Sequence, residues 1–167
     1  MSIIYCVGDI FRERDVQALA HGCNCAGAMG KGIAKQFKQR WPKMYQAYKE
    51  RCKQGLFNLG DVFVWEAEDI TIFNLGTQKT WKTKANINAI ETSFKKMLDI
   101  AEEKGITKIL MPRIGAGLGG MDWKEVTRTI ENYSNYTPGL LIYVCDEYVA
   151  DTPLIAKHCS NDVLADN

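Results

Sequence analysis

The hydrophobic positions along the chain follow two periods, and each period predicts a different element. Short apolar runs bounded by polar or glycine-containing segments predict strands, here at residues 2–10, 16–24, 61–66, 70–76, 108–114 and 139–146. Apolar residues spaced three or four positions apart predict helices, here at residues 29–41, 44–55, 86–105 and 121–133. Strands that alternate with helices predict an α/β fold, in which helices cover both faces of a mostly parallel sheet.

The chain of 167 residues fits one domain, which we expect over residues 1–148. Residues 149–167 are polar and weakly patterned, so we expect them to form a loose tail. In a mostly parallel sheet, ligands bind beyond the carboxyl ends of the strands, where loops lead into helices. We therefore expect the functional site among these loops.

The composition is that of an ordinary globular protein, with 46% hydrophobic and 25% charged residues. The formal net charge of +1 creates no long-range field for attracting nucleic acid or membrane, so we expect neither strong nucleic-acid binding nor a membrane partner. The sequence shows no signal peptide and no apolar run long enough to span a bilayer. Its six cysteines are scattered, and we expect reduced thiols in a cytoplasmic monomer.

Two glycine-rich segments stand at predicted strand-to-helix junctions. They are NCAGAMGKGIA at residues 24–34 and RIGAGLGGMDW at residues 113–123. Glycine lets the backbone approach a ligand closely, and the positive end of a following helix favours an anion such as phosphate. Each segment alone is equally compatible with a tight turn, whereas the two together can hold a pyrophosphate from both sides.

Neither segment is a standard nucleotide motif. The first is not a Walker A loop, because Lys31 is followed by Gly32 rather than by serine or threonine. The second matches G-x-G-x-x-G at Gly115, Gly117 and Gly120, but its helix is predicted to begin after the last glycine. A nicotinamide-binding Rossmann site is therefore the less favoured interpretation.

His21, Cys23 and Cys25 precede the first glycine segment and have three possible roles. Zinc requires three or four ligands, and the other candidates, His158 and Cys159, lie in the polar tail, so we expect no metal site. A cysteine nucleophile beside His21 is a second possibility, and simple packing is the third. We assign a site role to His21 because it leads into the phosphate-binding segment.

The segments VGDI, HGCNCAGAMGKGIAKQFKQRWP and PRIGAGLGGMDW resemble the macrodomain family, which binds ADP-ribose. The resemblance runs from about Ile3 to Cys145 and implies a three-layer α/β/α fold with a mostly parallel mixed sheet. The chain looks most similar to the branch that holds terminal ADP-ribose glycohydrolases, DNA ADP-ribosyl glycohydrolase antitoxins and yeast-type ADP-ribose 1″-phosphate phosphatases. The ligand that this implies is ADP-ribose or ADP-ribose 1″-phosphate, with ADP-ribosylated macromolecules as further partners and no cofactor.

The resemblance also implies a role for each matching residue. Asp9, with Gly8 and Ile10 beside it, would accept a hydrogen bond from the adenine amino group, and Asn24 would meet the distal ribose. The other residues implied to bind the ligand are Met29, Gly30, Lys31, Gly32, Ile33, Thr77, Ile114, Gly115, Ala116, Gly117, Leu118, Gly119 and Gly120.

Two departures from this branch bear on catalysis. Its glycohydrolases carry a lysine where Gln78 follows Thr77 here, and an amide cannot form a Schiff base with an opened ribose. The terminal glycohydrolases use an aspartate where this chain has Gly119.

We therefore expect hydrolysis at the distal ribose, first of all removal of phosphate from ADP-ribose 1″-phosphate. The catalytic candidates are His21 as general acid or base, Asn24 and Gln78. The alternatives are a reader of ADP-ribose without turnover and a de-ADP-ribosylase that acts on protein or nucleic acid through water attack.

Overall fold

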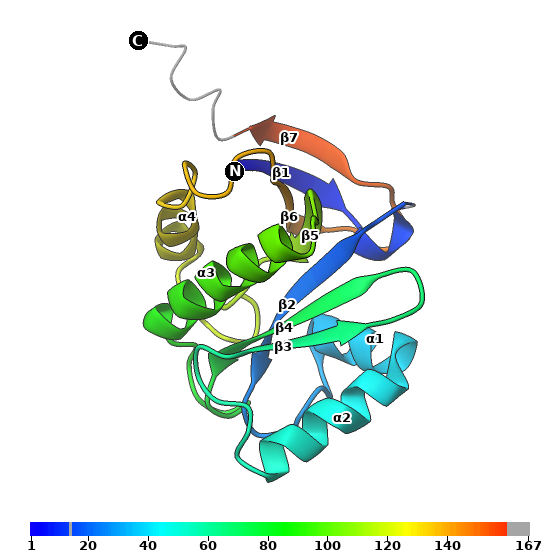
Figure 1. The fold of residues 1–167 in the computed structure, drawn as a ribbon, viewed down its shortest axis with the longest axis vertical. Coiled ribbons are helices and arrows are strands. Elements are labelled where there is room, and N and C mark those ends of the chain that lie inside the picture. The colour runs from blue at the N-terminus through cyan, green and yellow to red at the C-terminus, as the bar shows by residue number, and fades with distance from the viewer. Residues whose placement is uncertain (14, 160–167) are drawn as a thin grey trace.

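The structure, a computed structural model, describes residues 1–13 and 15–159. The described residues contain a seven-stranded mixed sheet (Figure 1). Its strands are β1 (Ser2–Gly8), β2 (Ala18–Asn24), β3 (Val62–Glu66), β4 (Thr71–Gln78), β5 (Lys108–Pro112), β6 (Leu141–Tyr148) and β7 (Ile155–Cys159). The order across the sheet is β3-β4-β2-β5-β6-β1-β7, and β3 and β7 pair antiparallel with their neighbours while all other pairs are parallel. The expected mostly parallel mixed sheet is confirmed.

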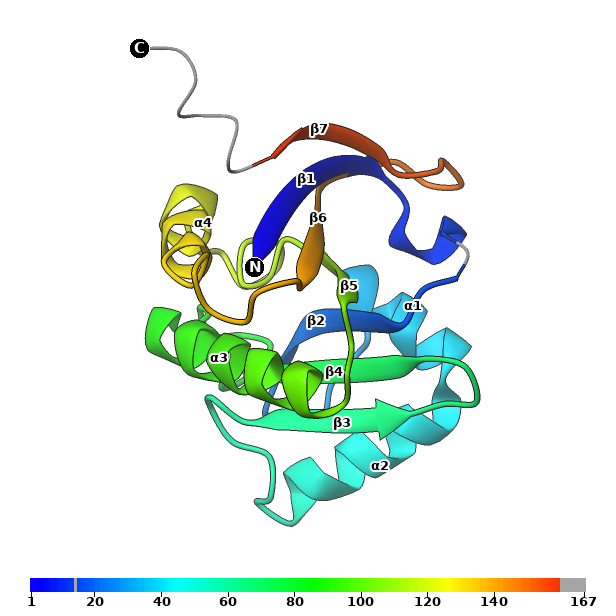
Figure 2. The same ribbon diagram turned by 45° about the horizontal axis from the view of Figure 1, so that its top comes forward.

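Helices cover both faces of the sheet, as Figure 2 shows. The helices are α1 (Gly32–Arg40), α2 (Pro42–Lys53), α3 (Ile87–Glu103) and α4 (Trp123–Glu131). On one face, Phe94 and Met97 of α3 and Val126 of α4 are fully buried in one apolar cluster. On the other face, Phe37 of α1 and Tyr48 of α2 are buried in a second cluster. The three-layer α/β/α architecture is therefore confirmed.

The α1–α2 region differs from its prediction at both helix starts. Helix α1 begins at Gly32 rather than at Met29, because Lys31 is still extended and Gly32 takes a left-handed φ of +61°. Pro42 ends α1 as expected, but it also serves as the first residue of α2. Proline suits that position because a first-turn residue has no helical partner for its N–H group.

The segment after Tyr148 is not uniformly a loose tail. Ile155–Cys159 forms β7, which pairs antiparallel with β1 and provides one edge of the sheet. This correction has a backbone origin: strand pairing requires only main-chain hydrogen bonds, so a short segment whose apolar residues do not alternate with polar ones satisfies it. The remainder of the predicted tail, residues 160–167, lies outside the described residues.

A short 3-10 helix, η1 (Ile10–Arg12), follows β1 and was not predicted. It begins at Asp9, whose side chain accepts a hydrogen bond from the backbone N–H of Phe11 at 2.9 Å. A capped turn of this kind fixes the direction in which the chain leaves the sheet at the carboxyl end of β1.

Candidate functional site

Three loops meet at the carboxyl edge of the parallel strands: β2–α1, β4–α3 and β5–α4. A Cβ atom placed on Gly32 would lie 3.4 Å from Cδ1 of Leu118, so the two glycine-rich loops lie side by side. The β4–α3 loop joins both of them, because the Cys25 N–H donates to Gln78 O at 2.8 Å and the Ala85 N–H donates to Gly119 O at 2.8 Å. The two segments predicted from sequence to share a ligand are therefore neighbours in space.

The glycines of these loops fall into two groups. Gly30 and Gly117 are exposed, and no described atom lies within 4 Å of a Cβ built on either. A Cβ on Gly119, in contrast, would lie 2.6 Å from Gly115 O, and Gly115 itself has a φ of +72° with Ile90 packed against it. Gly115 and Gly119 are thus needed by the loop itself, whereas Gly30 and Gly117 leave open space that a ligand can enter.

Asp9 lies where β1 ends, and only 3% of it is exposed. Its carboxylate accepts hydrogen bonds from the N–H groups of Phe11 at 2.9 Å and Asp151 at 3.1 Å, and from the Tyr148 hydroxyl at 3.5 Å. A carboxylate offers about four acceptor positions, so one remains for an amino group such as that of adenine. Tyr148 was missed in the sequence, since nothing in its neighbourhood indicates that β6 ends beside Asp9.

Asn24 holds the β2–α1 loop together through its side-chain amide. Its Oδ1 accepts from the N–H groups of Ala26 at 3.0 Å and Ala28 at 3.2 Å and from the Tyr48 hydroxyl at 3.0 Å. Its Nδ2 donates to Ala28 O at 2.8 Å. The amide therefore shapes the loop that carries Gly30, and the predicted contact of Asn24 with the distal ribose stays a prediction.

His21 is fully buried within the layer between β2 and α1. Its ring stacks on Phe37 with centroids 3.8 Å apart, and its Nε2 lies 2.6 Å from Oδ1 of Asn74. Burial lowers the pKa of His21 to about 4. The predicted role as general acid or base does not fit this position, because such a group must reach the substrate.

Cys23 shares this buried position, with its Sγ 3.4 Å from Nε2 of His21. Burial raises the pKa of the Cys23 thiol, so it stays protonated and is a poor nucleophile. The thiols of Cys6, Cys23, Cys25, Cys52 and Cys145 are free in the structure. Of the alternatives left open for His21 and Cys23, packing agrees best with the geometry.

The buried imidazole predicts that the fold becomes less stable in mild acid. Between pH 6.5 and 4 the unfolded chain binds a proton at His21 and the folded chain does not, so stability falls as the pH falls, by about 3 kcal/mol in total. His21→Asn removes the titrating group, and its unfolding free energy should fall less than that of the wild type over this range in urea titrations.

His158→Gln provides the control for this prediction, because the chain contains only two histidines. Its pH dependence gives the contribution of the other histidine, against which the change in His21→Asn is compared. Equal pH slopes for wild type and His21→Asn would contradict a neutral, buried His21.

Gln78 ends β4 and ties down the loop that follows it. Its Nε2 donates to the carbonyl oxygen of Thr83. The neighbouring Thr77 is buried, and its carbonyl accepts from the N–H of Asn86 at 2.9 Å, at the start of α3. Gln78 therefore sits at the junction of the three loops, and its role in catalysis stays a prediction.

The other residues implied to bind the ligand differ in what they can offer. Ile10, Met29 and Ile114 are 1% exposed as whole residues, so neither their side chains nor their backbones present an open surface. Gly8 is buried beside Pro153, Lys31 and Leu118 are exposed, and Ile33 and Ala116 are half-buried. Which of these atoms contact a ligand stays a prediction.

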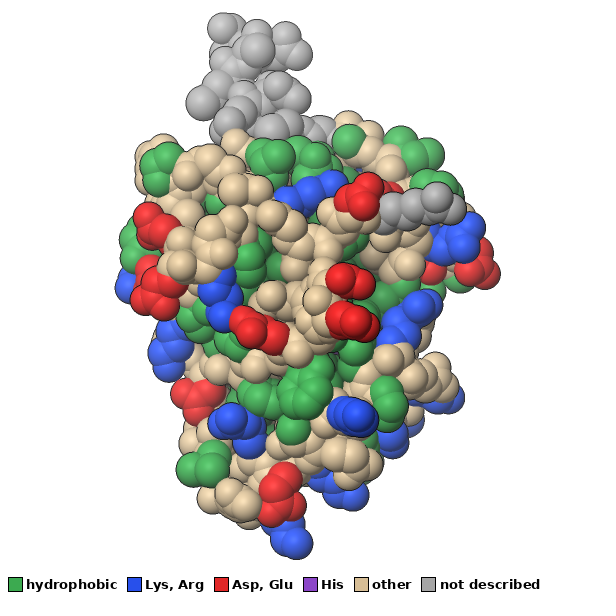
Figure 3. Space-filling model, turned by 45° about the vertical axis from the view of Figure 1, so that its right-hand side comes forward, with side chains coloured by type: hydrophobic (Ala, Val, Ile, Leu, Met, Phe, Trp, Pro, Cys, Tyr) green, Lys and Arg blue, Asp and Glu red, His purple; other side chains and the backbone are tan. Residues whose placement is uncertain are grey.

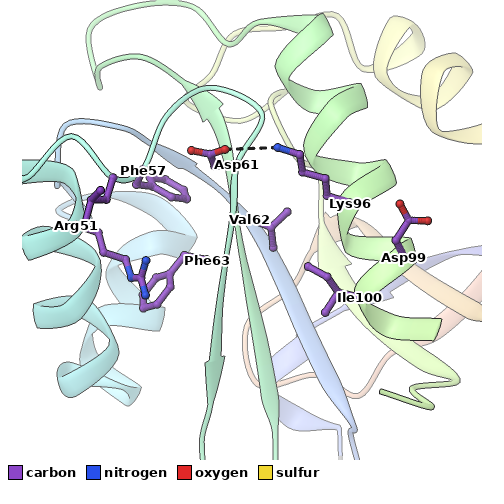
Figure 4. Close-up of a pocket in the computed structure, with 9 residues that line it drawn as sticks. Arg51, Phe57, Asp61, Val62, Phe63, Lys96, Asp99 and Ile100 are labelled. Atoms are coloured by element: carbon purple, nitrogen blue, oxygen red, sulfur yellow. Dashed lines mark hydrogen bonds and ion pairs between the residues drawn. The ribbon is translucent and has the colours of Figure 1, made fainter. Parts of the chain in front are cut away.

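Two hollows lie apart from the open space at Gly30 and Gly117. One, of about 400 Å³, lies at the β3 edge, where Arg51 packs on Phe63 and Lys96 pairs with Asp61 (Figure 4). The other, of about 490 Å³, lies beside α2 at Lys49 and Cys52. Neither is lined by a residue that we predicted to bind ADP-ribose.

Two further findings concern the described residues alone. No group of three or more His, Cys, Asp or Glu side chains among them is arranged to hold a metal ion. None of their helices combines the length and the apolar character that crossing a bilayer requires.

Comparisons with known proteins point to one family. The family model described as "Macro domain" matches residues 20–130. The DNA ADP-ribosyl glycohydrolase of Mycobacterium tuberculosis is 36% identical over 132 residues, which are 77% of this chain and 37% of that protein. The ADP-ribose 1″-phosphate phosphatase of Candida albicans is 31% identical over 147 residues, covering 80% of this chain and 94% of that protein.

Solved structures show the same fold. The macrodomain of Thermus aquaticus DarG superposes with a TM-score of 0.78 at 32% identity, covering 86% of this chain and 97% of that one. The curated DNA ADP-ribosyl glycohydrolases that the chain matches are much longer, since it spans about two fifths of their length. The matched family model, the identities and the fold together show that this chain belongs to the macrodomain family.

Proposed function

We propose that this protein binds ADP-ribose groups at the carboxyl edge of its sheet and hydrolyses the bond at C1″ of the distal ribose. The observation that carries this proposal is the contact of the two glycine-rich loops at Gly32 and Leu118. The relatives named above, which include ADP-ribosyl glycohydrolases and ADP-ribose 1″-phosphate phosphatases, support it.

The described side chains suit the parts of ADP-ribose in order. Asp9 accepts a hydrogen bond from the adenine amino group with the acceptor position that its three present partners leave open. The pyrophosphate lies over Gly30 and Gly117, where no Cβ blocks it, and beside the first turn of α1. Free N–H groups and the positive helix end at Gly32 favour the two negative charges there.

Catalysis in this proposal depends on water rather than on a covalent adduct. Gln78 has no amine, and His21 is buried away from the loops' open surface. The chain's contribution is to hold the distal ribose at the junction of the three loops, so that water attacks C1″ or its phosphate with assistance from the substrate's own charged groups.

Two leaving groups remain in competition. Release of inorganic phosphate is favoured by the length match, because the chain covers 94% of the Candida phosphatase. Cleavage of ADP-ribose from a macromolecule is favoured by sequence identity, which is 36% to the Mycobacterium glycohydrolase and 31% to the Candida phosphatase.

A panel of three substrates tests the proposal: ADP-ribose 1″-phosphate, mono-ADP-ribosylated protein and ADP-ribosylated DNA. Turnover of at least one, with phosphate or ADP-ribose as the product, is the expected result. Binding of ADP-ribose without turnover of any of the three would leave only the reader function.

Restoring an amine at position 78 should increase de-ADP-ribosylation. Gln78→Lys places a primary amine at the loop junction, so release of ADP-ribose from a modified macromolecule should rise by about tenfold or more. Phosphate release from ADP-ribose 1″-phosphate should change little, because it needs no ring-opened adduct. Both rates are measured by separating the products chromatographically.

Gln78→Arg is the matched control, because it adds the same charge without a nucleophilic amine. An equal gain in both variants would show that charge, not covalent chemistry, raises the rate. A second restoration, Gly119→Asp, is less suitable, since a Cβ there lies 2.6 Å from Gly115 O and forces the loop to move.

A further inference from the structure

Strand β3 forms one edge of the sheet and lacks the features that usually protect an edge. Natural proteins keep edge strands from pairing with other chains by means of charged residues, prolines or a covering segment. Residues 62–65, which are most of β3, are all apolar. Phe63 is buried, whereas Val62, Val64 and Trp65 are half-buried, so part of each of these three side chains remains accessible. The edge is therefore suited to pairing with a further strand.

The direction of the backbone groups along β3 shows which of them are open. Asp61 O accepts from the Gly76 N–H at 2.8 Å, and Phe63 O accepts from the side chain of Asn74 at 3.0 Å, so both carbonyls face β4. Backbone groups of an antiparallel strand alternate in direction from one residue to the next. The residues whose N–H and C=O groups face the open edge are therefore Val62, Val64 and Glu66.

The hollow of about 400 Å³ lies along this edge, between α2 and α3 (Figure 4). Phe63 points toward α2, where the Arg51 guanidinium packs on its ring at 4.5 Å, and Val62 points toward α3. Leu56, which is 58% exposed, adds a further apolar side chain. Open backbone groups and apolar surface thus occur together, as they do where a strand is added to a sheet.

Charge is distributed unevenly along β3. At its start, Lys96 is balanced by Asp61, and the last turn of α2 adds Arg51 and Lys53. At its end, the β3–β4 turn has exposed acidic residues, which are Glu66, Glu68 and Asp69. Figure 3 brings forward the side on which this turn lies in Figure 1, and acidic side chains gather near the middle of that face, directly above apolar ones. A strand with the same charges that runs antiparallel to β3 would place its acidic end beside the basic start.

We propose that β3 pairs antiparallel with β3 of a second copy of this chain, across a two-fold axis at Val64. In this register Val64 lies opposite Val64 of the second copy, and Val62 lies opposite Glu66 of the second copy. Each backbone group at the open edge then has a hydrogen-bonding partner. The same surface is used by both copies, so the contact closes as a dimer. The sequence led us to expect a monomer, because an unprotected edge is visible only in the fold.

The side chains suit this register on both faces of the sheet. Phe63 lies opposite Trp65 of the second copy, and these two rings already pack edge to face within one copy, with centroids 6.3 Å apart. Aromatic pairs across neighbouring strands stabilise a sheet. On the α3 side, Glu66 of the second copy lies opposite Val62, in the hollow that Lys96 lines. Lys96 is exposed and can pair with that carboxylate as well as with Asp61.

An extended peptide from another protein is the competing occupant of this edge. Such a peptide would gain the same backbone hydrogen bonds. A second copy of β3 also brings the matching rings and an acidic turn for the basic start of the strand. The observations therefore favour the second copy.

Analytical ultracentrifugation at protein concentrations from about 1 to 100 µM tests the proposal, and the wild type should change from monomer to dimer over this range. Val64→Pro removes only an N–H group that faces the edge, a position at which edge strands accept proline. It should weaken dimerisation at least about tenfold. Val64→Lys should have a similar effect, because it places two like charges opposite each other.

A charge reversal tests the register. Lys96→Glu and Glu66→Lys should each weaken dimerisation about fivefold, because each brings two like charges together across the interface. The variant that carries both changes should return to within about twofold of the wild-type affinity. Failure of the double variant to recover would overturn this register.

Ile155→Lys is the matched control for Val64→Lys, because it adds the same charge to β7 at the other edge, where Ile155 is 65% exposed. An equal loss of dimer in this control would show a general charge effect and overturn the proposal. So would a dimer that both Val64 variants leave intact, or a wild type that stays monomeric at about 100 µM. A monomeric wild type that binds a labelled peptide with the sequence of residues 61–67 would show that the edge takes an extended peptide instead.

Circular dichroism checks that each variant folds. If Val64→Pro does not fold, Val64→Lys and the charge reversal still decide between the outcomes. The test does not involve ADP-ribose, so its result is independent of the proposed function.

Discussion

Replacing Gly117 with valine should weaken ADP-ribose binding by at least about a hundredfold, or about 2.7 kcal/mol. No described atom lies within 4 Å of a Cβ at this position, and its φ is not left-handed, so the folded protein accepts the side chain without strain. The valine methyl groups would instead fill the space in which the pyrophosphate lies. Calorimetry gives the affinity, and the melting temperature should change by no more than about 2 °C.

Gly30→Val should have the same effect from the opposite loop, because its surroundings are equally open. Gly32→Val is a less direct test, since a φ of +61° adds about 1–2 kcal/mol of strain to any loss of contacts. Ala26→Val is the control: it enlarges an exposed residue of the same loop that lines the hollow beside α2. Normal ADP-ribose binding by both Gly30→Val and Gly117→Val would show that the loops are only turns.

The contrast between Gly117 and Gly119 shows what the sequence could not reveal. Both stand in one glycine-rich segment, and the resemblance implies the same role for them. In the structure, Gly119 is required by contacts with Gly115 O and Ala85, whereas Gly117 faces open space. These contacts depend on how the β5–α4 loop folds back on the start of α3, which no periodicity encodes.

Periodic segments were predicted well because burial alone determines them. Helix α3 shows this: Ile90, Phe94 and Met97 are fully buried, as their spacing indicated. Strand β7 was missed because its pairing with β1 depends on main-chain hydrogen bonds at an edge, and its exposed residues carry no apolar pattern.

The error at His21 has a related cause. A histidine between a strand and a glycine-rich loop is compatible with catalysis and with packing. Only the contacts of its side chain in the folded protein distinguish these two roles. Phe37 and Asn74, which contact its ring, are 16 and 53 residues away in the chain. Asn24 was predicted as a site residue from the resemblance, but its bonds to Ala26, Ala28 and Tyr48 became visible only in the fold.

Asp9→Asn should weaken ADP-ribose binding at least about tenfold, because a hydrogen bond to a charged group contributes about 1.5–3 kcal/mol. The asparagine oxygen still accepts from the Phe11 N–H, so η1 keeps its cap. Its amide NH₂ replaces the oxygen that now accepts from Asp151 N and Tyr148, and the oxygen left for the adenine amino group belongs to a neutral amide instead of a carboxylate. Asp9→Ala should lose both the hydrogen bond to adenine and the cap of η1, so its melting temperature should be lower than that of Asp9→Asn.

The loss must be separated from a loosening of the segment that follows β6, since Asp9 also holds Asp151. Glu13→Ala provides this control: Glu13 accepts from the Leu154 N–H at 2.8 Å, so its removal frees the same segment and leaves the Asp9 carboxylate in place. Calorimetry should show near-normal affinity for Glu13→Ala and for Tyr148→Phe. The latter removes the longest of the Asp9 contacts, together with the hydrogen bond that the Tyr148 hydroxyl accepts from Gln36 Nε2 at 3.1 Å. If Glu13→Ala weakens binding as much as Asp9→Asn does, the segment rather than the carboxylate recognises the base, because the only change the two variants share is the loss of that anchor.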